Sequence, residues 1–136
     1  MTRAGASIET VMTRQVVLIL ADIPLSQAQA IARQYDYNGF PIVTIEGRLV
    51  GMITKGDLLR ATRASFTDPG TWGQPVSRWM AHGVLALRPG DSLRTAVDNM
   101  ADSGFRSLPV IDDAGRVVGI VSRNDLMAAV GGEVPA

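Results

Sequence analysis

The chain repeats itself at a constant spacing of 68 residues, and this repeat restricts the possible folds more than any other feature of the sequence. Residues 8–62 can be placed on residues 76–130 without a gap, and 12 of the 55 compared positions are then identical. One shift that holds over such a length indicates tandem copies of a single structural unit. A unit of this size is too small to bury a sheet well alone, so we expect the two copies to pack together.

Both copies show the same order of predicted elements, βαββα, which makes the expected fold class α/β (α+β). Strands are expected at residues 16–20, 40–45 and 49–53 of the first copy, and at 84–87, 108–111 and 117–121 of the second. Helices are expected at 24–37, from 54 onwards, at 92–104 and at 122–130, the last one ending at Gly131-Gly132. Short turns are expected at 8–12 and 76–80. We expect the two sheets to pack face to face about a pseudo-twofold axis, which would leave two equivalent clefts, one per half.

The stretch 64–75 contains the breaker clusters Asp68-Pro69-Gly70 and Gly73-Gln74-Pro75, which predicts a linker, 64–75, between a first domain at 8–62 and a second at 76–130. Trp72 and Trp79 flank Pro75, and we expect them to pin this linker to the core rather than to bind a ligand.

Composition excludes several classes of site. Basic and acidic residues number 13 each, and this balance argues against broad binding to nucleic acid or to membrane surfaces. Cysteine is absent and His82 is the only histidine, which excludes thiolate chemistry and most zinc and Ser-His-Asp sites. No apolar stretch approaches the ~20 residues of a membrane span, and Met1–Ser7 has no apolar run behind it. We therefore expect a cytoplasmic protein with no membrane partner.

One heptad occurs in both copies, as GMITKGD at 51–57 and GIVSRND at 119–125. In each heptad a hydroxyl residue precedes a predicted helix and an aspartate follows three residues later, so Thr54 with Asp57 can form a capping box that only stabilises the helix start. The same atoms can instead bind a ligand, because a helix N-terminus attracts phosphate and a carboxylate accepts hydrogen bonds from a ribose diol. The heptad glycine would allow a close approach at the end of the strand. The two interpretations are compatible, since the cap can serve when no ligand is bound.

Taken together, these motifs resemble the cystathionine-β-synthase (CBS) domain, and two of them in tandem resemble a CBS pair, also called a Bateman module. The resemblance rests on the two heptads, on the Gly-Arg-apolar-Val-Gly sequence that leads into each, and on an x-apolar-Pro-apolar pattern at 39–42 and 107–110. It covers about residues 8–130. No single motif is specific, but the ordered set occurring twice is.

The resemblance implies that adenosine-containing ligands bind in the clefts: AMP, ADP or ATP, and in some members S-adenosylmethionine. It implies that Thr54 and Ser122 meet phosphate, that Asp57 and Asp125 meet ribose, and that the adjacent Lys55 and Arg123 can assist. It implies that adenine is lined by Asn38, Gly39, Phe40 and Pro41 in one half and by Arg106, Ser107, Leu108 and Pro109 in the other. Val16 and Val84, at the start of the first strands, would pack on the base. No cofactor is required.

The two halves differ where Arg106 replaces Asn38. A guanidinium gives charge-assisted hydrogen bonds of about 1.5–3 kcal/mol each, whereas an amide gives only neutral ones. We expect phosphorylated ligands to favour the half that contains Arg106.

The favoured hypothesis is a stand-alone regulatory module that binds a nucleotide, forms a homodimer and signals by conformational change to an unknown partner protein. The alternative is a structural or oligomerisation module whose clefts stay empty. A nucleotide hydrolase that uses Asp57 and Asp125 is a weaker hypothesis, because the repeat places these acids in separate clefts. DNA binding is weaker still, because the net charge is zero and no DNA-binding motif is present.

Overall fold

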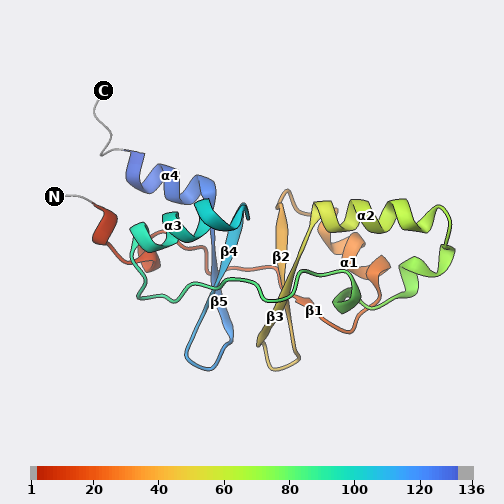
Figure 1. Cartoon of the computed structure of the whole chain (residues 1–136). Helices are drawn as coiled ribbons and strands as arrows, with labels where there is room; N and C mark the ends of the chain where they lie inside the picture. Colours follow the sequence, from red (N-terminus) through yellow and green to blue (C-terminus); the bar gives the residue numbers. More distant parts are fainter. Residues whose placement is uncertain (1–2, 132–136) are drawn as a thin grey trace. The chain divides into compact units, whose positions relative to one another are not determined.

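The computed structural model describes residues 3–131 and divides into two compact units. The central unit comprises residues 17–84, and the terminal unit joins described residues up to 16 with those from 85 onwards. Each unit combines strands with helices, and in each the helices lie on one side of the strands (Figure 1). The mixed α/β fold with two related halves, predicted from the repeat, is confirmed.

The central unit contains a three-stranded sheet of order β1-β2-β3. Strand β1 runs parallel to β2, and β2 runs antiparallel to β3. Its elements are β1 (Ile19–Leu20), α1 (Leu25–Ala32), β2 (Gly39–Val43), β3 (Leu49–Thr54), α2 (Lys55–Ser65) and the 3-10 helices η3 (Pro69–Gly73) and η4 (Val76–Arg78).

The terminal unit contains the antiparallel pair β4–β5, which corresponds to the hairpin β2–β3. Its elements are the 3-10 helices η1 (Arg3–Gly5) and η2 (Ile8–Thr10), followed by α3 (Leu93–Ser103), β4 (Ser107–Ile111), β5 (Val117–Ser122) and α4 (Arg123–Gly131). In both hairpins the turn ends in a glycine with positive φ, Gly47 (87°) and Gly115 (81°), a conformation that other residues rarely adopt. The four strands of the two hairpins were predicted to within one or two residues.

The first strand of each copy was predicted too long. Only Ile19–Leu20 of the expected strand 16–20 pairs, with Ile42 and Val43 of the parallel strand β2. The expected strand 84–87 is wrong, since the second copy makes only one isolated parallel bridge, from Leu87 to Val110. Pro89 follows closely and has no N–H to extend the ladder.

Helix α1 is also shorter than predicted. It ends at Ala32 instead of continuing to residue 37, because residues 33–38 are all exposed and give the core nothing to hold a further turn. Tyr35 falls inside the expected helix 24–37 but lies beyond the observed one, with its ring stacked on that of Tyr37 at a centroid distance of 5.5 Å.

The second copy's helices agree with the prediction. The hydroxyl of Ser92 accepts a hydrogen bond from the Thr95 N–H (3.1 Å) at the start of α3, and Gly104 ends this helix in the left-handed region. Helix α4 extends to Gly131. Gly132, expected to help end it, lies outside the described residues.

Each compact unit contains the segment that leads into the other copy. In the terminal unit, Ile8 N–H donates to the Asp91 carbonyl (2.9 Å). In the central unit, Val76 N–H donates to the Ile23 carbonyl (3.0 Å). Val76 is the counterpart of Ile8 and Ile23 that of Asp91, so this is the equivalent bond with the two copies interchanged. The two copies therefore exchange their leading segments. The sequence domains 8–62 and 76–130 remain our proposed division of the chain, and each compact unit takes its first segment from the other domain.

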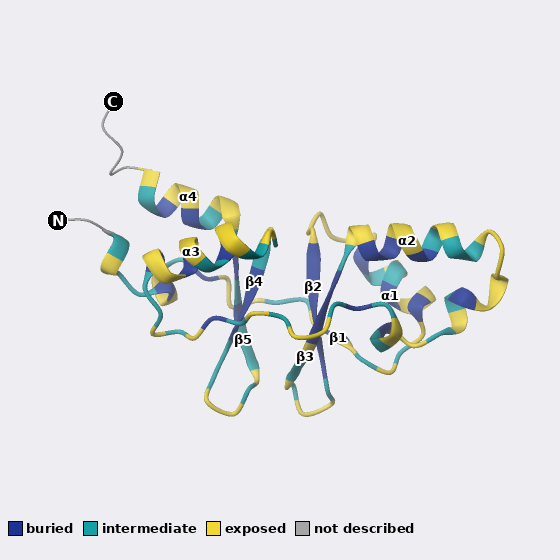
Figure 2. Cartoon of the chain, viewed as in Figure 1, coloured by how far each residue is buried: buried dark blue, intermediate teal, exposed yellow. Residues whose placement is uncertain are grey.

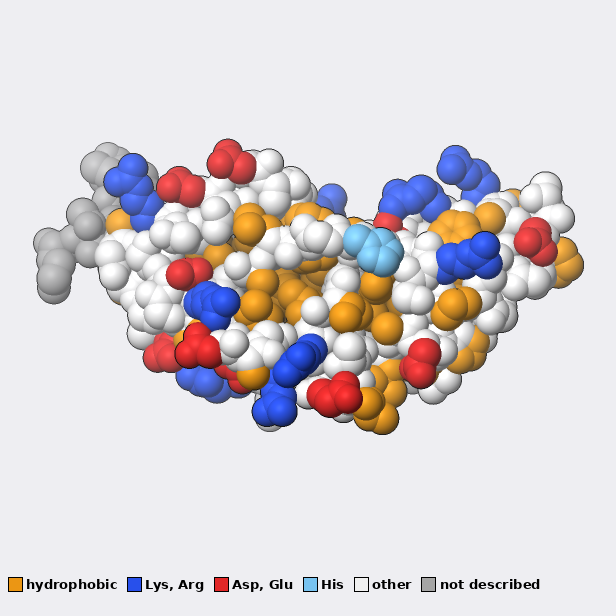
Figure 3. All heavy atoms as spheres, turned by 60° about the horizontal axis from the view of Figure 1, so that its bottom comes forward, with side chains coloured by type: hydrophobic (Ala, Val, Ile, Leu, Met, Phe, Trp, Pro, Cys, Tyr) orange, Lys and Arg blue, Asp and Glu red, His pale blue; other side chains and the backbone are white. Residues whose placement is uncertain are grey.

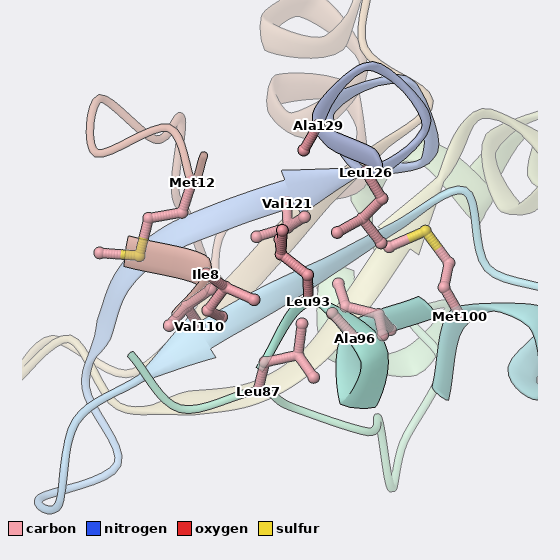
Figure 4. Packing of buried hydrophobic residues seen from close by; sticks show 11 residues of the cluster. Ile8, Met12, Leu87, Leu93, Ala96, Met100, Val110, Val121, Leu126 and Ala129 are labelled. Carbon is pink, nitrogen blue, oxygen red and sulfur yellow. The ribbon is translucent and has the colours of Figure 1, made fainter. Parts of the chain in front are cut away.

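Each unit has its own apolar core. In the terminal unit, Leu87, Val110 and Val121 face residues of α3 and α4, and Ile8 and Met12 of the exchanged segment complete the cluster (Figure 4). The helices show one buried and one exposed face, as their apolar spacing predicts (Figure 2).

The stretch expected to be a linker is partly built into the central unit. Thr71 of η3 is buried, and Trp72 and Trp79 pack against the central core, as predicted for these two residues. The indole N–H of Trp79 donates to Gln74 Oε1 (2.9 Å).

Candidate functional site

The fold brings the segments before Pro41 and Pro109 beside the heptad of the same copy. In the central unit, Gly39 pairs with Thr54, and the Lys55 N–H donates to the Asn38 carbonyl (3.0 Å). In the terminal unit, Ser107 pairs with Ser122, and the Arg123 N–H donates to the Arg106 carbonyl (2.9 Å). The residues expected to line adenine and the residues expected to bind phosphate therefore lie side by side within each unit.

The central heptad forms a complete capping box. Thr54 Oγ1 accepts a hydrogen bond from the Asp57 N–H (3.2 Å), and Asp57 Oδ2 accepts from the Thr54 N–H (2.8 Å). The Thr54 hydroxyl also lies 3.1 Å from Asp57 Oδ2, to which it donates. These bonds fix the carboxylate at the start of α2, where the helix dipole favours negative charge.

The terminal heptad forms the same reciprocal pair. Ser122 Oγ accepts from the Asp125 N–H (3.1 Å), and Asp125 Oδ2 accepts from the Ser122 N–H (3.0 Å). The capping interpretation made from the sequence is therefore confirmed for both heptads.

The caps leave little of the helix start unused. A helix begins with four N–H groups that have no partner inside the helix. In α2 the caps and the Asn38 carbonyl engage those of Thr54, Lys55 and Asp57. Among the described residues, only the Gly56 N–H of these four has no such partner, and Asn124 is its counterpart in α4. An anion at the central site would bind to this N–H rather than to an open helix end, and it would reach the Thr54 hydroxyl proton only in place of Asp57 Oδ2.

One residue near the site was missed in the sequence. Arg60, one turn after Asp57, donates from Nη2 to Asp57 Oδ1 and forms an ion pair with it. The Asp57 side chain is only 9% exposed, whereas that of Arg60 is 58% exposed. Ala128 occupies the equivalent position in the second copy. The available signal was a basic residue three positions after the aspartate, a spacing that brings side chains together on a helix.

Close packing explains why the first heptad begins with a glycine, and the sequence did not reveal this packing. A Cβ at Gly51 would lie 2.5 Å from Met80 Sδ and 2.7 Å from the Ala81 carbonyl oxygen. The segment that approaches β3 so closely belongs to the chain itself, and it makes two hydrogen bonds there, between Ala81 and Met52 (2.7 and 3.1 Å). The identical pair Met12 and Met80, at the same distance before each heptad, was the signal in the sequence.

A family model, "CBS domain", matches residues 8–64 and 76–132. The chain belongs to the CBS domain family. It is 32% identical to the CBS domain-containing protein YhcV of Bacillus subtilis over 121 residues, which are 89% of this chain and 83% of that protein. It is 29% identical to a homoserine O-acetyltransferase of Methanohalophilus mahii, but spans only 24% of that protein.

Solved CBS proteins share this fold. The structure of CBSX2 in complex with AMP has a TM-score of 0.82 and 23% identity, over 95% of this chain and 98% of that one. The CBS domain pair of protein MJ0100, in complex with 5′-methylthioadenosine and S-adenosyl-L-methionine, has a TM-score of 0.79 and 23% identity, over 95% and 98% of the two chains. At these identities the likeness shows the fold.

The other predicted site residues of this CBS protein lie in different environments. Phe40 and Leu108 are fully buried core residues, and Gly39, Pro41 and Pro109 are also buried. Ser107 is half-buried, whereas Asn38 and Arg106 are exposed. Val16 and Val84 are half-buried and lie outside the strands that they were expected to open. Val16 falls in the terminal unit and Val84 in the central unit, so each shares a unit with the other copy's heptad.

The two basic residues beside the hydroxyls are already engaged. Lys55 Nζ lies 3.7 Å from Asp36 Oδ1. An exposed ion pair of this kind contributes little to stability. Arg123 Nη2 donates to the Gly104 carbonyl (3.3 Å) at the end of α3. Arg123 also borders a groove of about 340 Å³ between α3 and α4, which is otherwise lined by Val97, Met100, Ala101, Gly104, Leu126, Met127 and Val130.

Two further properties of the described part of the chain concern metal-ligating side chains and helix length. Residues 3–131 contain no group of three His, Cys, Asp or Glu that could hold a metal ion, and His82 is exposed. No described helix is long and apolar enough to cross a membrane. On the face shown in Figure 3, acidic and basic side chains are mixed rather than gathered by sign.

Proposed function

We propose that this CBS pair is a regulatory module that binds an adenosine-containing ligand at each heptad and signals to a partner protein in the cytoplasm. The observation that carries the proposal is the repeated geometry. In both units a hydroxyl, a carboxylate and the start of a helix stand beside the segment that precedes the proline. Related folds solved with AMP, or with 5′-methylthioadenosine and S-adenosyl-L-methionine, support adenosine as the common ligand chemistry.

The chemistry of the terminal heptad fits such a ligand. A carboxylate offers about four acceptor positions, so Asp125 can keep its bond to the Ser122 N–H and still accept two from a ribose diol. The Ser122 hydroxyl accepts from the Asp125 N–H and can donate its own proton to a phosphate oxygen. The chain has no net positive charge that would attract a phosphate. Exposed Arg106 supplies a positive charge locally.

Ligand binding at a cap gives a physical route to a signal. The capping side chains hold the start of α4 to the end of β5. A ligand that bonds to the same atoms changes the stability and orientation of that junction, and a partner that distinguishes the two states responds to the ligand.

Titration calorimetry with AMP, ADP, ATP and S-adenosylmethionine tests the proposal, on the unmodified protein and on Asp57→Asn and Asp125→Asn. Asparagine keeps a carbonyl oxygen for the cap but lacks the charged acceptor, so these variants separate ligand binding from folding. Asp102→Asn, at an exposed position of α3, is the matched control for the change of charge. We expect each site variant to lose one class of sites. Unchanged binding in both would contradict the assigned roles.

A second candidate function is a structural module without a small ligand, and the completeness of both capping boxes favours it. Thermal unfolding separates the two functions. A ligand present at 100 times its Kd adds about 2.7 kcal/mol to the free energy of unfolding, whereas an empty module shows no shift with any nucleotide.

We also propose that the module forms a homodimer through its helices. Leu59 on α2 and Met127 on α4 occupy equivalent positions in the two copies, and they are 71% and 64% exposed. Large apolar side chains repeated at the same exposed position suit a symmetric interface. Sedimentation of Leu59→Asp and Met127→Asp should show monomers, and a dimer that survives both changes contradicts this interface.

A further inference from the structure

The Asp57 carboxylate has partners on both of its oxygens. Oδ2 accepts from the Thr54 N–H (2.8 Å) and the Thr54 hydroxyl (3.1 Å). Oδ1 accepts from the Arg60 guanidinium, which also neutralises the charge of the carboxylate. The acceptor expected to bind ribose in the central unit is therefore engaged by a side chain of its own helix.

The terminal heptad lacks this internal competitor. Asp125 keeps the capping bond from the Ser122 N–H (3.0 Å), but Ala128 stands one turn later, and its methyl group donates no hydrogen bond. Asp125 is also less buried than Asp57. The two sites thus share the same motif and differ in the availability of the carboxylate.

We propose that Arg60 is a specificity-determining residue that occupies Asp57, so that the terminal heptad is the stronger ribose site. The inference rests on the proposed function, because it concerns how strongly each of the two proposed sites binds the ribose of the ligand. A ribose diol donates two hydrogen bonds to a carboxylate, and at Asp57 it must displace Arg60 from Oδ1 to make both. At Asp125 no side chain of α4 at that position has to move.

This competition is separable from any effect of Arg106. Arg106 acts on phosphate, whereas Arg60 acts on the acceptor of the diol. Removing the 2′ and 3′ hydroxyls from the ligand removes the interaction with Asp57 or Asp125 and leaves phosphate and adenine unchanged. The ratio of the Kd of 2′,3′-dideoxy-AMP to the Kd of AMP therefore measures the diol interaction alone, and we call it the diol preference.

The experiment uses two single-site proteins and titration calorimetry with both ligands. Asp57→Asn leaves the terminal carboxylate intact, and Asp125→Asn leaves the central one. We expect a diol preference of about tenfold or more in the first protein and a clearly smaller one in the second. Adding Arg60→Ala to the second protein should raise its preference by about two- to fivefold, the range for a half-exposed ion pair.

The reciprocal change completes the test. Adding Ala128→Arg to the first protein should lower its diol preference by a similar factor, because the new arginine stands three residues after Asp125. Positions 60 and 128 are both exposed, so neither change disturbs a core. Arg63→Ala is the matched control, since it removes an exposed arginine from α2 without touching Asp57.

The possible results are distinct. If AMP binds but Arg60→Ala and Ala128→Arg leave the diol preference unchanged, the inference is wrong and the proposed function stands. The same holds if Arg63→Ala acts as strongly as Arg60→Ala, because the effect is then one of overall charge. If AMP, ADP, ATP and S-adenosylmethionine all fail to bind to the unmodified protein, the proposed function is wrong and the inference fails with it.

Discussion

Replacing Gly51 with alanine tests whether the exchanged segment needs a glycine on β3. The new Cβ would lie 2.5 Å from Met80 Sδ and 2.7 Å from the Ala81 carbonyl oxygen. The methionine side chain can rotate away, but the carbonyl belongs to backbone that is bonded to Met52 in both directions (2.7 and 3.1 Å). Relief of the clash therefore weakens two backbone hydrogen bonds.

The magnitude follows from these contacts. Two weakened hydrogen bonds cost about 1–3 kcal/mol together, and forced overpacking costs a similar amount. Alanine lowers the conformational entropy of the unfolded chain, which adds about 0.4–1 kcal/mol to the free energy of unfolding. We expect Gly51→Ala to lower the free energy of unfolding by roughly 3 kcal/mol.

Gly119 provides the matched comparison in the terminal unit. Its Cβ would lie 3.0 Å from both Met12 Sδ and the Thr13 carbonyl oxygen, so a shift of a few tenths of an ångström is enough. We expect Gly119→Ala to cost no more than about 1 kcal/mol, because the gain from the unfolded chain offsets most of the crowding.

Urea unfolding followed by two signals measures both variants. Trp72 and Trp79 are the only tryptophans and both belong to the central unit, so their fluorescence reports that unit, whereas far-ultraviolet circular dichroism reports both. Gly51→Ala should lower the fluorescence midpoint clearly, and Gly119→Ala should leave it nearly unchanged. Equal destabilisation by the two changes, or a Gly51→Ala protein as stable as the parent, would refute the reasoning.

Three further changes have expected outcomes that urea unfolding or thermal unfolding checks. Ser92→Ala removes the hydroxyl that caps α3 (3.1 Å from the Thr95 N–H) and should cost about 1 kcal/mol. Gly104→Ala places a side chain at a φ of 77° and should cost about 1–2 kcal/mol, whereas Gly104→Asn should cost less. Leu87→Ala empties a fully buried position of the terminal core and should cost about 2–5 kcal/mol, while Leu85→Ala, at an exposed position nearby, should cost under about 0.5 kcal/mol.

Local sequence signals predicted the hairpins and most helix ends because those elements depend on nearby residues. Gly47 and Gly115 set the turns, and Ser92 and Gly104 set the two ends of α3. The first strands were predicted poorly because a short apolar run does not say how much of it pairs with a partner strand, which depends on contacts between distant parts of the chain. The exchange of leading segments is a contact between distant parts of the chain, which local sequence signals do not predict.

In the candidate site, too, most of the features that depend on neighbouring residues were predicted and those that depend on distant contacts were not. Both capping boxes were predicted, because each depends on residues three positions apart. Arg60 was not predicted because the repeat carries no sign of it, since Ala128 stands at the equivalent position of the second copy. The burial of Phe40 could be expected from its place in a strand, but the absence of a strand around Val84 could not.

The two differences between the heptad sites act in the same direction. Arg106 adds positive charge beside the terminal site, where Asn38 offers none in the central one, and Ala128 leaves Asp125 without the ion pair that engages Asp57. One difference concerns phosphate and the other concerns the ribose diol, so their effects on affinity should be nearly additive. A nucleotide such as AMP interacts with both groups, whereas a neutral nucleoside interacts with one. The proposed function therefore implies that AMP separates the two sites more widely than adenosine does, with the terminal site filling first.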